Sequence, residues 1–159
     1  MAGGNTMIMQ IDELKSALAE ISLREMETAS VTATDHDVKG TDLEATVPPE
    51  KVADAGRVLD DARFSLEAIT GIDWLAQGRF EIVYDYTHFD SGKRVTVRAF
   101  IGRDEPELPT LSAIYPSADW HERETHDFFG VLFTGHPDMA PLLLPEDADF
   151  HPLRKDFAG

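Results

Sequence analysis

The stretch Phe80–Ile101, FEIVYDYTHFDSGKRVTVRAFI, decides the fold because it carries the strongest two-residue periodicity in the chain. Large apolar side chains alternate with more polar ones over Phe80–Phe89, and Arg94–Ile101 repeats the pattern. Such alternation is typical of β-strands with one buried face. Ser91-Gly92 lies between the two runs and is a turn sequence. The stretch therefore predicts a β-hairpin.

Upstream of this hairpin the pattern predicts two helices and a second hairpin. Apolar residues recur at near-helical spacing over residues 11–26 and again over 52–62. Between them, the Val- and Thr-rich stretches Ser30–Thr34 and Leu43–Val47 predict two short paired strands. Pro48-Pro49 ends the second strand and begins the next helix.

Two segments flank the central hairpin directly. Phe64–Thr70 has a short helical pattern, and we expect this helix to end at Gly71. The acidic, proline-containing stretch Gly102–Pro109 predicts a loop.

A last helix is predicted to run to Phe129, with Ser117 or Asp119 as its N-cap and Gly130 at its end. Beyond Gly135, four prolines exclude a long helix. The chain thus predicts an α+β fold: a two-layer domain whose mixed sheet is covered by helices on one face. We expect a flexible leader over 1–9, the domain over 10–134 and an extended partner-binding arm over 135–159.

Charge restricts the partners. Thirty acidic against 14 basic residues give a formal net charge of −16. Phosphate binding needs a positive surface, so nucleic acid is excluded as a partner, and anionic lipid is disfavoured for the same reason. A basic protein or a place in a larger assembly fits this charge.

The chain has no cysteine, which excludes disulfides, thiolate nucleophiles and cysteine-held metal centres. No signal peptide is evident in MAGGNTMIMQ, and no apolar run approaches the roughly 18 residues that span a bilayer. We therefore expect a cytoplasmic protein that reaches the membrane only through partners.

The run Trp120–Gly130, WHERETHDFFG, is dense in ionisable groups and allows three interpretations. As a metal site it is weak: His121 and His126 are five residues apart, so their rings diverge by about 140° around a helix. A surface pair of Glu122 and His126 is favoured instead.

Acid–base catalysis is the second interpretation, because Glu122, Glu124 and Asp127 supply carboxylates beside His126. The chain lacks a glycine-rich phosphate loop, a G-x-S-x-G motif and a cofactor fingerprint. A solvated helix face is therefore favoured over a catalytic role.

Docking is the third interpretation. Arg123 and Asp127 are spaced to pair along the helix, and Phe128-Phe129 anchors it in the core. The apolar run Leu142–Leu144 has no helix of its own, so the arm covers either a partner, which we favour, or its own domain. The basic pair Arg154-Lys155 either meets the chain's own carboxylates or remains available to a partner.

Four ordered blocks, spread over residues 122–157, resemble the 30-kilodalton subunit of respiratory complex I. They are Glu122-Arg123-Glu124-x-x-Asp127-Phe128-Phe129-Gly130, Phe133-x-Gly135-His136-Pro137-Asp138, Leu143-Leu144-Pro145-Glu146-Asp147 and His151-Pro152-Leu153-Arg154-Lys155-Asp156-Phe157. The resemblance extends over about residues 47–157.

The resemblance implies a non-catalytic structural subunit of the hydrophilic arm of an NADH:quinone oxidoreductase. It implies no cofactor in this chain; flavin, iron–sulfur clusters and quinone belong to partner subunits. The expected partners are the large subunit that forms the quinone site and neighbouring iron–sulfur subunits. The expected partner-binding residues are Glu122, Arg123, Glu124, Asp127, His136, Pro137, Arg154 and Lys155.

Three departures from the complex I pattern keep a second assignment open. They are His126, Asp138-Met139-Ala140-Pro141 and Asp147-Ala148-Asp149. His126 and the run Pro141-Leu142-Leu143-Leu144 resemble the related subunits of energy-converting [NiFe] hydrogenases and formate hydrogenlyases, whose partners carry a nickel–iron centre. A stand-alone acidic protein-binding module is the alternative from another class.

Overall fold

The computed structural model describes residues 10–22 and 30–159. Within these ranges a five-stranded mixed sheet has the order β1-β2-β5-β4-β3, with β2 and β5 parallel and the other neighbours antiparallel. Its strands are β1 Val31–Ala33, β2 Leu43–Thr46, β3 Ser65–Trp74, β4 Arg79–His88 and β5 Lys93–Gly102. The predicted mixed α/β fold is confirmed.

The central hairpin is confirmed as the pair β4–β5, in which Phe80 opposes Ile101 and Tyr86 opposes Val95. One side of it is buried almost completely. Seven buried apolar residues there form the centre of the core together with apolar residues of the helices. They are Phe80, Ile82, Tyr84, Tyr86, Val95, Val97 and Ala99.

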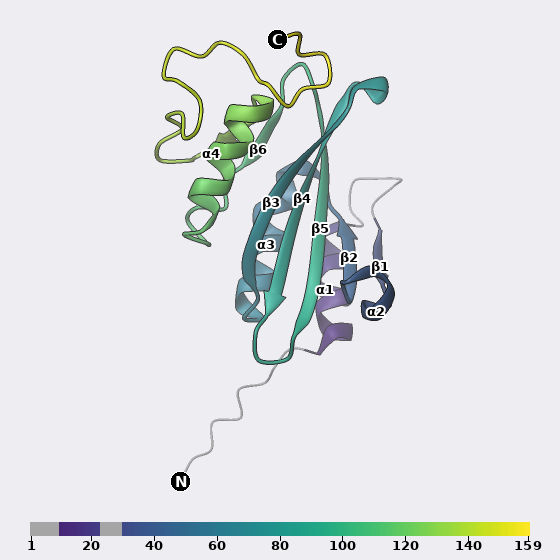
Figure 1. Ribbon diagram of the computed structural model, residues 1–159. Coiled ribbons are helices and arrows are strands. Elements are labelled where there is room, and N and C mark those ends of the chain that lie inside the picture. The colour runs from purple at the N-terminus through teal and green to yellow at the C-terminus, as the bar shows by residue number, and fades with distance from the viewer. Residues whose placement is uncertain (1–9, 23–29) are drawn as a thin grey trace.

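Helices α1, Ile11–Ser22, and α3, Val52–Asp61, cover one face of the sheet (Figure 1). Leu14 and Leu18 of α1 are fully buried, as the helical spacing predicts. The short helix α2, His36–Lys39, connects β1 to β2, and the 3-10 helix η1, Pro49–Lys51, leads into α3. The predicted leader 1–9 and the predicted end of the first helix, 23–26, lie outside the described residues.

The predicted short helix over Phe64–Thr70 is wrong, because its residues from Ser65 onward belong to strand β3. A register shift, the mark of a β-bulge, lies between Leu66 and Ala68. The extra residue leaves Leu66 and Ile69 three apart but both buried. That spacing imitates helical periodicity. Gly71 continues the strand instead of ending a helix.

The predicted loop Gly102–Pro109 ends in a short strand, β6, Glu107–Pro109. It pairs in parallel with β7, Leu132–Thr134, which follows the last helix. Three residues are too few for alternation to reveal a strand, so the long-range partner decides this element.

Helix α4, Ala118–Phe129, ends at Gly130 as predicted, with Gly130 in the left-handed region. Neither predicted N-cap is made: Ser117 occupies the cap position, but its hydroxyl donates to the carbonyl of Leu66. This bond ties the start of α4 to β3, the edge strand beside which the helix lies (Figure 1). After β7 the chain is irregular, and it passes over α4 to the C-terminus.

Candidate partner-binding interface

Glu122 on α4 is fully buried, so the predicted surface pair with His126 is wrong. Its Oε1 accepts the backbone N–H of Leu111 at 2.6 Å, and its Oε2 accepts the hydroxyl of Thr110 at 2.5 Å. Burial raises the pKa of Glu122 to about 7, although both hydrogen bonds oppose this shift. The carboxyl therefore fixes α4 to the segment before it.

The side chain of His136, at the start of the arm, is also fully buried. Its Nδ1 accepts the N–H of Asp138, so the ring N–H is on Nε2. Nε2 lies 3.4 Å from Asp119 Oδ1 and 3.9 Å from Glu122 Oε2. The first turn of the arm is thereby held on α4.

Asp127 holds the apolar run of the arm. Its Oδ2 accepts the backbone N–H groups of Leu142, Leu143 and Leu144 at 2.9, 2.7 and 3.1 Å. The predicted ion pair with Arg123 does not form, because the Arg123 guanidinium donates to the carbonyls of Ala140 and Pro141. Both side chains thus fix the arm instead of the helix.

The carbonyls at the end of α4 are satisfied by the last part of the arm. His151 Nδ1 donates to the carbonyl of Asp127 at 2.9 Å, and Arg154 Nε donates to that of Phe129 at 2.7 Å. The last carbonyls of a helix have no partner within the helix, and basic side chains can hydrogen-bond to them. Arg154 is therefore satisfied by the helix, and no carboxylate of the described residues pairs with it.

The C-terminal residues are tied to the sheet through a pair that sequence reasoning missed. Asp73 at the end of β3 accepts both the guanidinium of Arg103 and the N–H of Lys155. Arg103 also pairs with Asp156 at 2.7 Å. Asp73 and Arg103 are 30 residues apart, so no local spacing indicates their meeting. The Lys155 ammonium lies 5.9 Å from the centre of the Trp74 ring.

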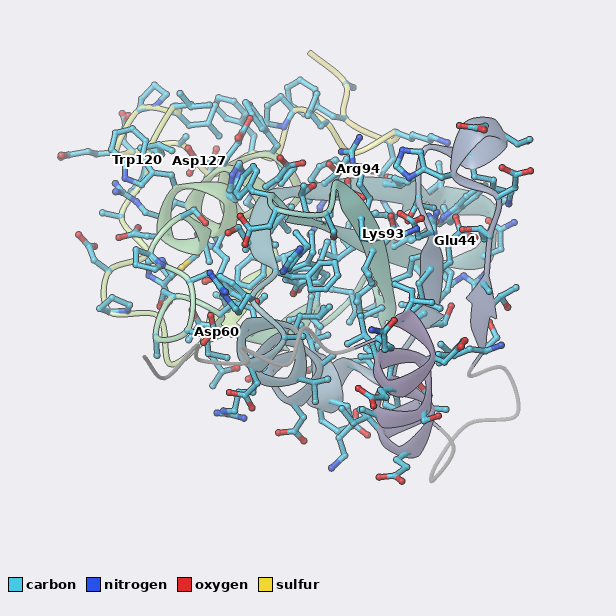
Figure 2. All side chains as sticks on the ribbon, turned by 90° about the horizontal axis from the view of Figure 1, so that it is seen from below. Glu44, Asp60, Lys93, Arg94, Trp120 and Asp127 are labelled. Carbon is cyan, nitrogen blue, oxygen red and sulfur yellow. The ribbon has the colours of Figure 1, made fainter. Side chains whose placement is uncertain are left out.

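The arm therefore covers its own domain, and several of its apolar side chains remain exposed among acidic ones. Leu143 and Leu153 are 59% and 54% exposed, and the rings of Phe150 and Phe157 stack at 5.7 Å. Trp120, 65% exposed, projects from the molecule beside the arm (Figure 2). We call these five exposed apolar residues of α4 and the arm the outer apolar face.

The expected partner-binding residues divide into two groups. Glu122, Arg123, Asp127, His136 and Arg154 are occupied within the chain, where they position the arm. The others remain exposed on the surface: Glu124, Pro137 and Lys155.

In residues 10–22 and 30–159, no group of three or more His, Asp or Glu side chains is arranged to hold a metal ion. His126 binds the carbonyl of Val131, whereas His121 lines a groove beside β3, so the two imidazoles are used separately. Over the same ranges, no helix has the length and apolar character needed to cross a membrane.

Comparison with known proteins gives a consistent family. The family model described as "Respiratory-chain NADH dehydrogenase, 30 Kd subunit" matches residues 45–159. The corresponding NADH-quinone oxidoreductase subunit of Roseiflexus sp. strain RS-1 is 42% identical over 120 residues, which are 72% of this chain and 69% of the relative. The corresponding subunit of Salinispora tropica is 38% identical over 122 residues, or 73% of this chain but only 50% of the relative.

Two solved structures share the fold. One is a chain of the membrane-bound sulfane sulfur reductase, an archaeal respiratory membrane complex; it has a TM-score of 0.75 and 30% identity, and the match covers 92% of this chain and 85% of that chain. The other, a trypsin-resistant fragment of Nqo5, has a TM-score of 0.63 and 26% identity over 80% of this chain and 95% of the fragment. With the family model, these matches show that the chain belongs to the family of the 30-kilodalton subunit of the respiratory-chain NADH dehydrogenase.

Proposed function

We propose that this protein is a structural subunit, without a cofactor of its own, in the hydrophilic arm of a complex I-like NADH:quinone oxidoreductase. It docks on the large subunit of the quinone site and keeps that subunit in place beside the electron-transfer chain. Flavin, iron–sulfur clusters and quinone belong to the partners. The protein lies on the cytoplasmic side and reaches the membrane through those partners. Its membership of the 30-kilodalton subunit family supports this assignment.

The outer apolar face carries the docking proposal. Hydrogen bonds to Asp127 hold the backbone of the arm against α4, so Leu143 turns outward. Fully burying a leucine or phenylalanine side chain contributes about 1.5–3 kcal/mol, and a rigid arm loses little conformational entropy on binding. A preorganised apolar surface on a strongly acidic chain suits a protein partner.

Gentle purification of the tagged chain, followed by mass spectrometry, tests the assignment. We expect the large subunit and iron–sulfur subunits to co-purify in stoichiometric amounts. A stable monomer without partners contradicts the proposal and supports a stand-alone acidic module instead.

The double variant Leu143→Ser, Leu153→Ser locates the docking surface. It should fold normally but lose most of the co-purifying large subunit, because both side chains lie on the outer apolar face. Val38→Ser is the matched control: Val38 is 79% exposed on α2, at the opposite edge of the sheet from α4. Equal assembly of the double variant and the control would place the interface elsewhere.

A second candidate is the equivalent subunit of an energy-converting [NiFe] hydrogenase, a formate hydrogenlyase or a related membrane-bound reductase. The structural match to the chain from the sulfane sulfur reductase complex, with its TM-score of 0.75, favours it. The docking role is unchanged, but the electron acceptor differs. In the co-purified large subunit, two Cys-x-x-Cys pairs that hold nickel indicate a hydrogenase. Where they are absent, the reduction of quinone or of sulfane sulfur by the purified complex decides between complex I and the related reductase.

A further inference from the structure

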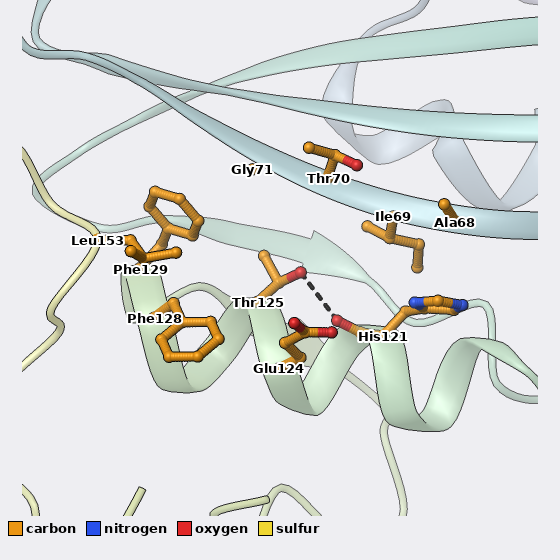
Figure 3. A pocket seen from close by; sticks show the side chains of 10 residues that line it. All are labelled: Ala68, Ile69, Thr70, Gly71, His121, Glu124, Thr125, Phe128, Phe129 and Leu153. Carbon is orange, nitrogen blue, oxygen red and sulfur yellow. Dashed lines mark hydrogen bonds between the residues drawn. The ribbon is translucent and has the colours of Figure 1, made fainter. Parts of the chain in front are cut away.

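A groove of about 310 Å³ lies between strand β3 and helix α4 (Figure 3). Ala68 and Gly71 of β3 form one wall, and Phe128 and Phe129 of α4 belong to the other. The Phe129 ring packs directly on Gly71, where an added Cβ would lie 2.6 Å from the ring. This contact sets the distance between helix and strand.

The groove follows an edge of the main sheet. Among the described strands, β3 pairs only with β4, and its other side faces α4. Edge strands present unpaired backbone groups and are usually covered or paired. Ala68–Gly71 line the groove instead of being fully covered by the helix. The site therefore suits an extended segment of polypeptide.

The two ends of the groove differ in chemistry. His121 lies toward one end, and Leu153, more than half exposed, lies at the other beside Phe129 (Figure 3). Glu124 lies between them on the helix side of the groove. Glu124 is exposed, and its neighbours one turn away include no lysine or arginine. Arg123 beside it is bound to the carbonyls of Ala140 and Pro141. Within the described part of the chain, the Glu124 charge is thus uncompensated, on a protein of net charge −16.

We propose that this groove binds an extended segment of the partner subunit that places an arginine or lysine against Glu124 and an apolar side chain against Phe128 and Leu153. The inference rests on the proposed function, because the groove is continuous with the outer apolar face at Leu153. The charge of Glu124 specifies a cationic residue, and the apolar wall supplies the buried contact.

Charge reversal in the assembled complex tests the groove. Glu124→Lys should lower the yield of intact complex on native gels about tenfold or more, because like charges at an interface strongly oppose association. Glu20→Lys is the matched control, since it reverses the same charge at an exposed position of α1, away from α4 and the arm, and it should change the yield by less than about twofold. The thermal midpoint of each purified variant checks that the fold is kept.

A second measurement identifies the occupant. A photo-crosslinking benzoylphenylalanine placed at Thr70, an exposed position in the groove, should capture a partner peptide that contains lysine or arginine. Capture of a second copy of this chain, or of a peptide without a basic residue, overturns the inference, as does wild-type assembly of Glu124→Lys. These outcomes differ from failure of the proposed function, in which the unmodified chain captures no large subunit at all.

Discussion

At the level of single residues, the two buried carboxylates of α4, Glu122 and Asp127, position different segments of the chain. Glu122 faces the segment Thr110–Leu111 and holds the helix to its own domain. Asp127, five residues later, lies at the arm and accepts three successive backbone N–H groups. Glu122 and Asp127, which the sequence alone suggests are solvated surface charges, thus determine the positions of helix α4 and the arm.

Replacing Asp127 with alanine should release the arm. The substitution leaves three backbone N–H groups without their acceptor, and hydrogen bonds to a charged group contribute about 1.5–3 kcal/mol each. Since the three bonds share one oxygen, we expect the free energy of unfolding to fall by about 2–4 kcal/mol. Urea denaturation measures this loss, and hydrogen exchange should show faster exchange at residues 142–144. Asp147→Ala, at an exposed position of the arm, should change stability by less than about 0.5 kcal/mol.

Glu122 should make the folded state less stable as the pH rises. Burial raises its pKa from an ordinary 4.5 to about 7, so the folded chain keeps this proton where the unfolded chain has lost it. The resulting stabilisation is complete below about pH 4.5 and is lost as the pH rises to about 7, a change of about 3 kcal/mol.

Urea denaturation of the wild type and of Glu122→Gln across this pH range isolates the effect, because the amide cannot ionise. The difference in unfolding free energy between the two proteins should change by about 3 kcal/mol between about pH 4.5 and 7. Glu124→Gln, at the exposed neighbour, should keep the pH dependence of the wild type. A constant difference between the wild type and Glu122→Gln would show that Glu122 titrates normally.

The contact between β3 and α4 matters most at the level of elements. The bulge in β3 brings Leu66 and Ile69 to the same buried side, and the bond from Ser117 to Leu66 fixes the start of the helix against the strand. Phe129 on Gly71 fixes its other end. The groove and the arm both depend on this arrangement.

Gly71→Ala should disturb the packing of α4 on β3. The added methyl would lie 2.6 Å from the Phe129 ring, so helix and strand must separate, at a cost of about 1–3 kcal/mol in unfolding free energy. Gly102→Ala is the control, because an added methyl at Gly102, the last residue of β5, meets nothing within 4 Å. Thermal and urea denaturation of both variants measure the difference. Equal stability of the two variants would mean that the Phe129 ring moves freely.

Charge acts at the level of the whole molecule. A chain of net charge −16 attracts a basic partner over distances that salt screens, with a Debye length of about 8 Å at physiological ionic strength. The association rate of the purified chain with a complex depleted of it should therefore fall about tenfold or more between roughly 50 mM and 500 mM salt. Binding kinetics on the immobilised, depleted complex measure this association rate. A rate that does not depend on salt would show that the apolar face alone drives docking.

Local patterns in the sequence were sufficient for several elements of the fold. The central hairpin, α1 and α3 follow from the two-residue and 3.6-residue periods, which record which side of each segment is buried. The end of α4 follows from Gly130, a helix-stop residue. The four motif blocks were sufficient to indicate the family, because their residue types, order and spacing resemble those of the 30-kilodalton subunit. Strand β3 was missed because a bulge breaks its alternation, and β6 because three residues are too few to show one.

By itself, then, the sequence determined the hairpin, the helices and the family membership, together with the acidic character that favours a protein partner. Only the tertiary structure decided where the ionisable residues act. It buried Glu122 against Leu111, turned Asp127 to the arm and joined Asp73 to Arg103 across 30 residues. Local periodicity reports burial within one segment, whereas each of these pairs depends on packing between segments that are distant along the chain.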